Sequence, residues 1–127
     1  MRLYIIRHGE TSWNKAKRLQ GRKDIMLDAD GIRLAEKTGE GMQDIDFDLV
    51  ISSPLIRAKQ TAELVLAGRQ IPMITDKRII EMSFGKWEGE SVRESTVLPA
   101  DYVDKFYHDP YHCPKAPGGE SFQDVLN

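Results

Sequence analysis

Four charged or titratable residues stand at the expected ends of strands or in loops, and together they could carry phosphoryl chemistry: Arg7, His8, Arg57 and Glu81. Two arginines can grip the oxygens of a phosphoryl group through forked, charge-assisted hydrogen bonds. A neutral imidazole beside them can act as a nucleophile, and flanking cations favour that neutral form. A nearby carboxyl group can protonate the departing alkoxide. The set is coherent only if the fold brings the four side chains together, and spacing alone does not decide that.

The elements that must position these residues begin with an apolar run at residues 3–6, which is typical of a strand buried on both faces of a parallel sheet. The run stops at Arg7 and His8, so we expect these two residues at the carboxyl edge of the sheet, where open α/β folds bind ligands. A second strand is predicted over residues 47–51. A helix should follow it to residue 66, with a serine as its cap and Pro54 at its first position.

Other elements are predicted on both sides of that pair. We expect a helix over residues 31–42, a short strand at 73–75, an irregular loop over 79–89, a helix over 100–107 and another that begins at Ser121. Alternating strands and helices predict an α/β fold with three α/β/α layers and a mainly parallel sheet. We expect one domain over residues 1–127 that lacks its C-terminal strand and helices, since the last predicted helix has no strand after it.

The composition limits the classes of function. The chain has 127 residues, 40% of them hydrophobic, which suits a folded domain, and its net charge of -2 gives no overall basic field for nucleic acid or an anionic membrane. No apolar segment approaches the roughly 20 residues that cross a bilayer. A single cysteine, Cys113, cannot form an intramolecular disulfide, so we expect a cytoplasmic protein.

Five blocks follow one another along nearly the whole chain. They are Arg7-His8-Gly9-Glu10-Thr11 with Trp13-Asn14 and Leu19-Gln20-Gly21-Arg22, then residues 27–31, residues 52–62, residues 81–89, and Pro117-Gly118-Gly119-Glu120-Ser121. Their residue types and their order resemble the signature of the histidine phosphatase, or phosphoglycerate mutase-like, superfamily. A lone Arg-His-Gly would be weak evidence for this family, whereas five blocks in the family's order are specific evidence for it.

The resemblance implies roles for individual residues. His8 would be the phosphorylated nucleophile, Arg7 and Arg57 would bind the phosphoryl group, and Glu81 would protonate the leaving group. The pocket for the substrate phosphate would be lined by Arg7, Asn14, Arg57, Thr11, Gln20 and Gly21. Residues 84–89 look like the phosphatase branch, which favours hydrolysis of a small-molecule phosphate ester, without a cofactor or a metal, over transfer within a mutase.

One departure from the family pattern leaves alternatives open. The family uses a second histidine after the helix expected to begin near Ser121, and this sequence has none there. The other histidines, His108 and His112, match no family motif. A catalytically silent phosphate-binding domain or an inactive fragment is therefore an alternative to a phosphatase, as is a phosphoglycerate mutase. Self-association, for example as a homodimer, would cover an incomplete sheet.

Two further groups of residues have competing interpretations. A basic cluster is most simply a solvated surface and alternatively steers an anionic ester; it consists of Lys15, Lys17, Arg18, Arg22 and Lys23. His108, His112 and Cys113 suggest a metal site, but Pro110 argues against the regular helix that such a spacing needs. We therefore predict no metal site.

Overall fold

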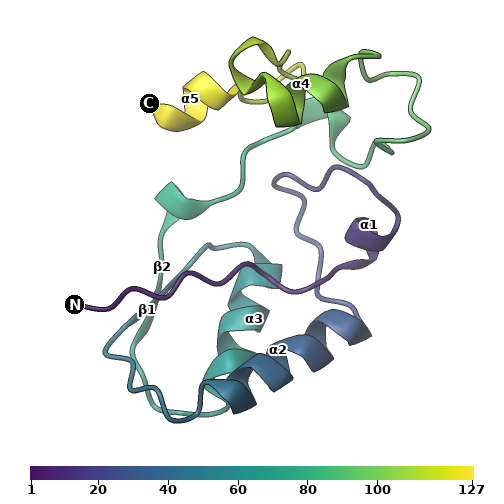
Figure 1. The fold of residues 1–127 in the computed structure, drawn as a ribbon. Helices are drawn as coiled ribbons and strands as arrows, with labels where there is room; N and C mark the ends of the chain where they lie inside the picture. The colour runs from purple at the N-terminus through teal and green to yellow at the C-terminus, as the bar shows by residue number, and fades with distance from the viewer. The chain divides into compact units, whose positions relative to one another are not determined.

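A computed structural model describes residues 1–127, and the chain forms two compact units (Figure 1). Unit 1 consists of residues 1–12 and 24–80, and unit 2 of residues 13–23 and 81–127. A short helix, α1 (Ser12–Lys15), stands where the chain passes from the first unit to the second. Each unit is described by itself below.

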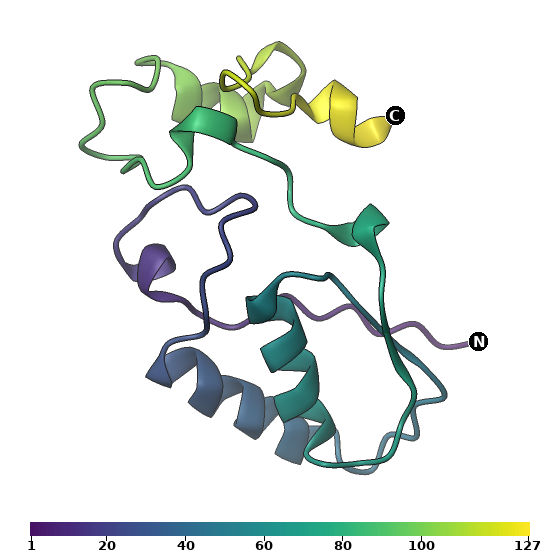
Figure 2. The same cartoon turned by 180° about the vertical axis from the view of Figure 1, so that it is seen from behind.

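Unit 1 has an α/β fold with a parallel sheet. Its elements are α2 (Ala29–Gly41), β1 (Val50–Ser52), α3 (Ile56–Leu66), β2 (Met73–Thr75) and the 3-10 turn η1 (Lys77–Ile79). Strands β1 and β2 are parallel, with Ile51 opposite Ile74, and helices α2 and α3 lie side by side (Figures 1 and 2). Gly39 of α2 permits this packing, because a Cβ there would lie 2.8 Å from the backbone oxygens of Leu64 and Val65. The predicted α/β class is confirmed.

The two helices of unit 1 begin differently. Asp28 caps α2, and its carboxylate accepts a hydrogen bond from the Gly31 N–H at 2.8 Å. The serine cap predicted for α3 is wrong, because the N-cap is Leu55 and makes no side-chain capping bond. Ser52 belongs to β1, and Ser53 accepts a bond from the Leu55 N–H at 3.3 Å in the turn that precedes the helix.

The predicted strand at residues 3–6 is also wrong. These residues lie outside the two-stranded sheet, and Leu3 and Ile5 are 77% and 88% exposed. A strand buried on both faces needs strands along its edges and a covering layer on each side. Unit 1 provides one pair of strands and one pair of helices, so the apolar run stays extended and exposed.

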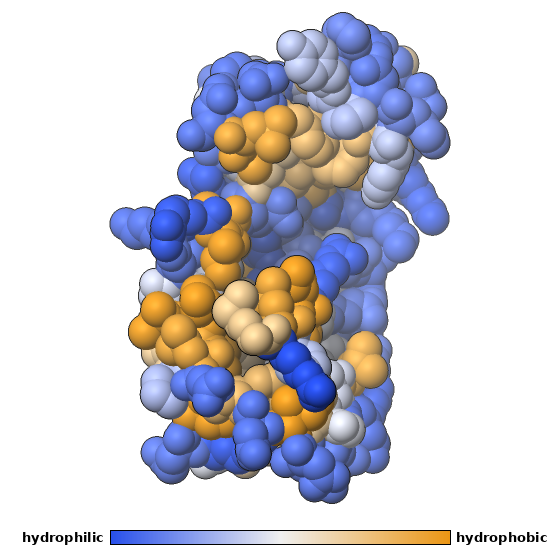
Figure 3. All heavy atoms as spheres, turned by 60° about the vertical axis from the view of Figure 1, so that its left-hand side comes forward, coloured by the Kyte–Doolittle hydropathy of each residue, from blue (hydrophilic) through white to orange (hydrophobic).

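The sheet of unit 1 also carries exposed apolar side chains. Ile51 and Ile74 are partners in the ladder, and they are 52% and 51% exposed. Figure 3 shows apolar side chains gathered on the side of unit 1 that bears the strands and the amino-terminal segment. This surface is defined here as the sheet face: Leu3, Ile5, Ile51 and Ile74.

Unit 2 contains short helices around an aromatic core. Its elements are η2 (Gly85–Trp87), α4 (Tyr102–His108), η3 (Pro110–His112) and α5 (Phe122–Leu126). The core contains Trp87, Tyr102, Cys113 and Ala116, with the rings of Trp87 and Tyr102 5.1 Å apart. Ser121 caps α5 in a capping box with Asp124, so the predicted helix start is confirmed. None of the helices in the chain is long and apolar enough to span a membrane.

Candidate active site

The side chain of His8 has a defined proton arrangement. Its Nδ1 lies 2.7 Å from the carbonyl oxygen of Gly9. A carbonyl oxygen can only accept a hydrogen bond, so Nδ1 must carry a proton and donate it. In the neutral ring the lone pair is then on Nε2. That tautomer is the one in which Nε2 can attack an electrophile.

The backbone beside His8 is hydrogen-bonded to a side chain of α3. The Gly9 N–H donates to Oγ1 of Thr61 at 2.9 Å, and the same hydroxyl donates to the carbonyl oxygen of Arg57 at 2.7 Å. Thr61 is buried, at 6% exposure. One hydroxyl therefore connects the segment that carries His8 with the first turn of the helix that carries Arg57.

The residues after Gly9 pack against the start of α2. The Asp28 N–H donates to the Glu10 carbonyl at 2.9 Å, and Thr11 forms an antiparallel bridge with Leu27. The Leu27 N–H in turn donates to Oε1 of Gln60 in α3, at 2.9 Å. Gly31 lets the chains meet, because a Cβ there would lie 2.2 Å from the Glu10 oxygen. Backbone contacts therefore fix the course of the chain past His8.

Four of the residues predicted for the site lie in unit 1: Arg7, His8, Thr11 and Arg57. Arg7 is exposed and His8 is partly buried. Arg57 is 1% exposed, although an arginine in the first turn of a helix is ordinarily solvated. A buried guanidinium must have its charge and its donors compensated, and the first turn of a helix is itself electropositive. Arginine is rarely this deeply buried unless it is paired.

The other predicted residues lie in unit 2: Asn14, Gln20, Gly21 and Glu81. Gln20 is buried and Asn14 is partly buried. Gly21 has a φ of +52°, and a Cβ there would lie 2.4 Å from Oε1 of Glu88. Glu81 is exposed, and its Oε1 accepts a hydrogen bond from the Met82 N–H at 2.8 Å. The predicted set is thus divided between the two units.

Sequence reasoning missed the roles of Gln60 and Thr61. Both belong to the block at residues 52–62 that carries the family resemblance, but only Arg57 in that block was given a role. Thr61 follows Arg57 by one helical turn, which places its hydroxyl within reach of the Arg57 carbonyl. That spacing was the available signal, although the link to Gly9 depends on the tertiary structure.

The residues considered for a metal have other partners in this structure. Nδ1 of His108 is 3.0 Å from a carboxylate oxygen of Asp104, and Nδ1 of His112 is 2.9 Å from one of Asp109. Cys113 packs in the core of unit 2, where burial raises the pKa of its thiol. Each of the two histidines is thus paired with a nearby carboxylate, and the cysteine lies in the core of unit 2.

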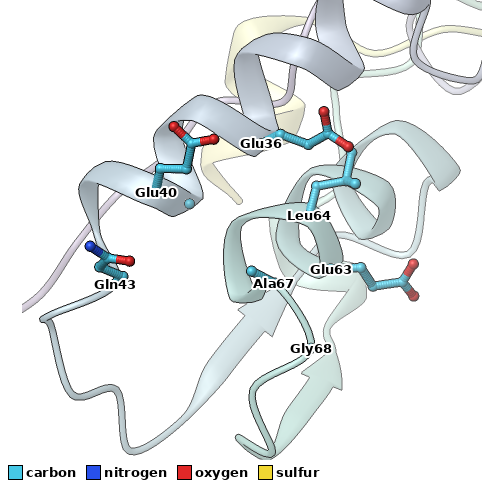
Figure 4. Close-up of a pocket in the computed structure, with 8 residues that line it drawn as sticks. Glu36, Glu40, Gln43, Glu63, Leu64, Ala67 and Gly68 are labelled. Carbon is cyan, nitrogen blue, oxygen red and sulfur yellow. The ribbon is translucent and has the colours of Figure 1, made fainter.

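A shallow groove of about 490 Å³ lies between α2 and α3. Figure 4 shows that Glu36 and Glu40 come from one helix and Glu63 from the other. Three carboxylates repel a phosphate ester. The groove is therefore a poor candidate for the phosphate site.

Comparison with known proteins gives the family of this chain. A sequence model described as the histidine phosphatase superfamily (branch 1) matches residues 3–127. The chain belongs to the histidine phosphatase superfamily. The resemblance carried by the five sequence blocks is thereby confirmed.

Two named relatives illustrate the similarity of this histidine phosphatase chain to others. It is 39% identical over 103 residues to the Bacillus subtilis protein named "uncharacterized phosphatase PhoE", with 81% of this chain and 52% of the relative covered. It is 37% identical over 123 residues to the Escherichia coli adenosylcobalamin/alpha-ribazole phosphatase, with 97% of this chain and 60% of the relative covered. The chain thus spans about half to three fifths of the length of these relatives.

Solved structures agree with the fold. The structure of a putative alpha-ribazole-5'-P phosphatase from Escherichia coli has a TM-score of 0.82 and 36% identity, and the match covers 94% of this chain and 59% of that one. The structure of Bacillus stearothermophilus YhfR has a TM-score of 0.84 and 37% identity, and the match covers 94% and 58% of the two chains. The histidine phosphatase fold follows from both.

Proposed function

We propose that this chain supports hydrolysis of small phosphomonoesters through a phosphohistidine at His8. The observation that carries the proposal is the 2.7 Å contact between Nδ1 of His8 and the Gly9 carbonyl. It leaves the lone pair of the neutral ring on Nε2, as a histidine nucleophile requires. Membership of the histidine phosphatase superfamily supports the same class of chemistry.

The first step would form the phosphoenzyme. Nε2 of His8 attacks phosphorus in line, and a P–N bond forms while the P–O bond to the alcohol breaks. The guanidinium groups of Arg7 and Arg57 balance the charge on the non-bridging oxygens. Glu81 gives its proton to the departing alkoxide.

The second step would release phosphate. The Glu81 carboxylate takes a proton from water as the water oxygen attacks phosphorus, and the P–N bond breaks with its electron pair returning to the imidazole. Polar groups of Thr11, Asn14, Gln20 and Gly21 would hold the substrate phosphate. The arginines supply the positive charge that a metal provides in other phosphatases, so the proposal includes no metal or cofactor.

A mutase is the second candidate. The chain is 38% identical over 92 residues to the Proteus mirabilis protein named "probable phosphoglycerate mutase GpmB", with 72% of this chain and 43% of that relative covered. A mutase would return the phosphoryl group to a bound acceptor and would depend on a bisphosphorylated primer. Primer-dependent isomerisation of phosphoglycerate without net phosphate release would favour it.

The proposed enzyme would work on a small anionic metabolite in a reducing compartment such as the cytoplasm. Cys113, the one cysteine of the sequence, is buried in the core of unit 2. A buried thiol of this kind behaves as a small apolar side chain. The specific phosphate ester is left to a substrate panel that includes alpha-ribazole phosphate, because a relative is named for that activity.

The proposal is tested by phosphate release from an aryl phosphate in the presence of a chelator, with the wild-type chain and a His8→Ala variant. We expect chelator-resistant release by the wild type and a loss of at least about 100-fold in the variant. Acid-labile phosphate bound to the wild type after a rapid quench should also disappear in the variant. Phosphate binding without turnover by a folded wild-type chain would instead support a silent binding domain.

A further inference from the structure

The segment that carries Glu81 has no regular structure of its own. Residues 81–84 lie between η1 and η2, and no strand or α-helix includes them. The Glu81 carboxylate accepts a bond from the next N–H, that of Met82, so its position follows the backbone at these two residues. Whatever fixes this backbone therefore fixes the carboxylate.

Arg22 and Glu120 hold this backbone from two distant parts of the sequence. Nε of Arg22 donates to the Glu81 carbonyl oxygen at 3.1 Å, and its Nη2 donates to both carboxylate oxygens of Glu120, at 2.9 and 3.0 Å. Glu120 Oε2 accepts from the Ser83 N–H at 2.9 Å, and the Glu120 N–H donates to the Ser83 carbonyl at 2.8 Å. The ion pair therefore bonds to the loop on both sides of Met82.

Glu88 fixes the backbone of Arg22. Its Oε1 accepts from the Arg22 N–H at 2.9 Å and from the Phe84 N–H at 3.2 Å. Gly21, with its φ of +52°, leaves room for that carboxylate, since a Cβ would lie 2.4 Å from Oε1. All of these residues belong to unit 2.

The ion pair is better suited to positioning than to stability. The side chains of Arg22 and Glu120 are 41% and 29% exposed, and exposed pairs contribute little to the free energy of folding. Besides bonding to each other, both charged groups bond to the backbone around Glu81: Arg22 to the Glu81 carbonyl and Glu120 to the Ser83 N–H. The planar guanidinium fixes the direction of its Nε bond to Glu81 relative to its Nη2 bonds to Glu120.

We propose that Arg22 and Glu120 are positioning residues that hold Glu81 for proton transfer to the leaving group. This inference rests on the proposed function. It assigns a role to two motif residues that the phosphohistidine chemistry leaves without one.

The structural part of the proposal is tested by hydrogen–deuterium exchange of peptides covering residues 80–84. In Arg22→Met and Glu120→Ala we expect exchange there to be about tenfold faster or more. Glu120→Ala removes the acceptor of the Ser83 N–H, and Arg22→Met removes the guanidinium that holds this acceptor. The matched control is Lys115→Met, which removes another exposed ion pair of unit 2, the 3.1 Å contact with Asp124. The clamp is defined here as the Arg22–Glu120 pair with its hydrogen bonds to the backbone of Glu81 and Ser83. Unchanged exchange over residues 80–84 in both test variants would overturn the clamp, whether or not the chain is an enzyme.

The catalytic part is tested by the leaving group. A dinitrophenolate leaves without a proton, whereas an alkoxide needs one, so a misplaced acid slows only the alkyl ester. We expect kcat/KM for an alkyl phosphate to fall at least about tenfold more than that for dinitrophenyl phosphate in both variants, with partial rescue in Arg22→Lys. Equal losses on the two esters would overturn the positioning role.

The His8→Ala variant separates the two proposals. Release of phosphate that does not depend on His8 would count against the proposed function, and the exchange experiment would still decide whether the clamp exists. Faster exchange together with a selective loss on the alkyl ester would support both.

Discussion

At the residue scale, Thr61 links the proposed nucleophile with a proposed phosphate ligand. Its hydroxyl accepts from the Gly9 N–H and donates to the Arg57 carbonyl. Both halves of the proposed phosphoryl site in unit 1 thus depend on one oxygen atom. The side chain contributes no charge, so sequence motifs for catalysis do not indicate it.

We expect Thr61→Val to destabilise the chain by about 1–3 kcal/mol, because it keeps the shape but leaves the Gly9 N–H without its acceptor. Urea unfolding followed by far-ultraviolet circular dichroism measures the change. Thr61→Ser retains the hydroxyl and should lose less. Equal losses in the two variants would mean that the methyl group, rather than the hydrogen bonds, matters at this position.

At the element scale, α2 supports the loop after His8 through one close contact. Gly31 lies in the first turn of the helix, against the backbone of Glu10. Alanine is normally favoured over glycine inside a helix by about 1 kcal/mol. Here the added methyl group would lie 2.2 Å from the Glu10 oxygen, so backbone would have to move.

We therefore expect Gly31→Ala to destabilise the chain by about 1–3 kcal/mol, against the helix propensity. Gly41, in the same helix, is the matched control, because a Cβ there has no atom within 4 Å. Gly41→Ala should range from neutral to about 1 kcal/mol stabilising. Thermal unfolding of the two variants compares them directly, and a stable Gly31→Ala protein would show that the Glu10 backbone can yield.

At the scale of the whole molecule, the sheet face is the most conspicuous surface. Two ladder partners, Ile51 and Ile74, are half exposed, and Leu3 and Ile5 in the amino-terminal segment are also exposed. Figure 3 shows apolar side chains gathered on this side of unit 1. Apolar surface beside unpaired strand edges promotes association between chains.

We expect the 127-residue chain to self-associate as its concentration rises. The double variant Ile51→Lys/Ile74→Lys should shift sedimentation toward the monomer, because lysines on a half-exposed face oppose its burial. Val97→Lys adds charge at a residue of unit 2 that is 58% exposed and serves as the control. A wild-type chain that stays monomeric over the whole concentration range would contradict this expectation.

Local sequence signals located most elements well. The strand at Met73–Thr75, the end of α3 at Leu66 and the capped start of α5 at Ser121 lie where they were predicted. Each depends on residues within a few positions of one another, through capping bonds, periodicity or β-branched runs. The order of the motif blocks likewise identified the superfamily.

The tertiary structure decided what depends on distant residues. It left residues 3–6 exposed, because a buried strand needs neighbours that a local run cannot supply. It buried Arg57, and it paired Arg22 with Glu120 across 98 positions of the chain. The sequence by itself determined which side chains could do chemistry and to which family the chain belongs. Packing between remote segments decided which parts of the backbone hold each of these side chains in place, because such contacts depend on residues far apart in the chain.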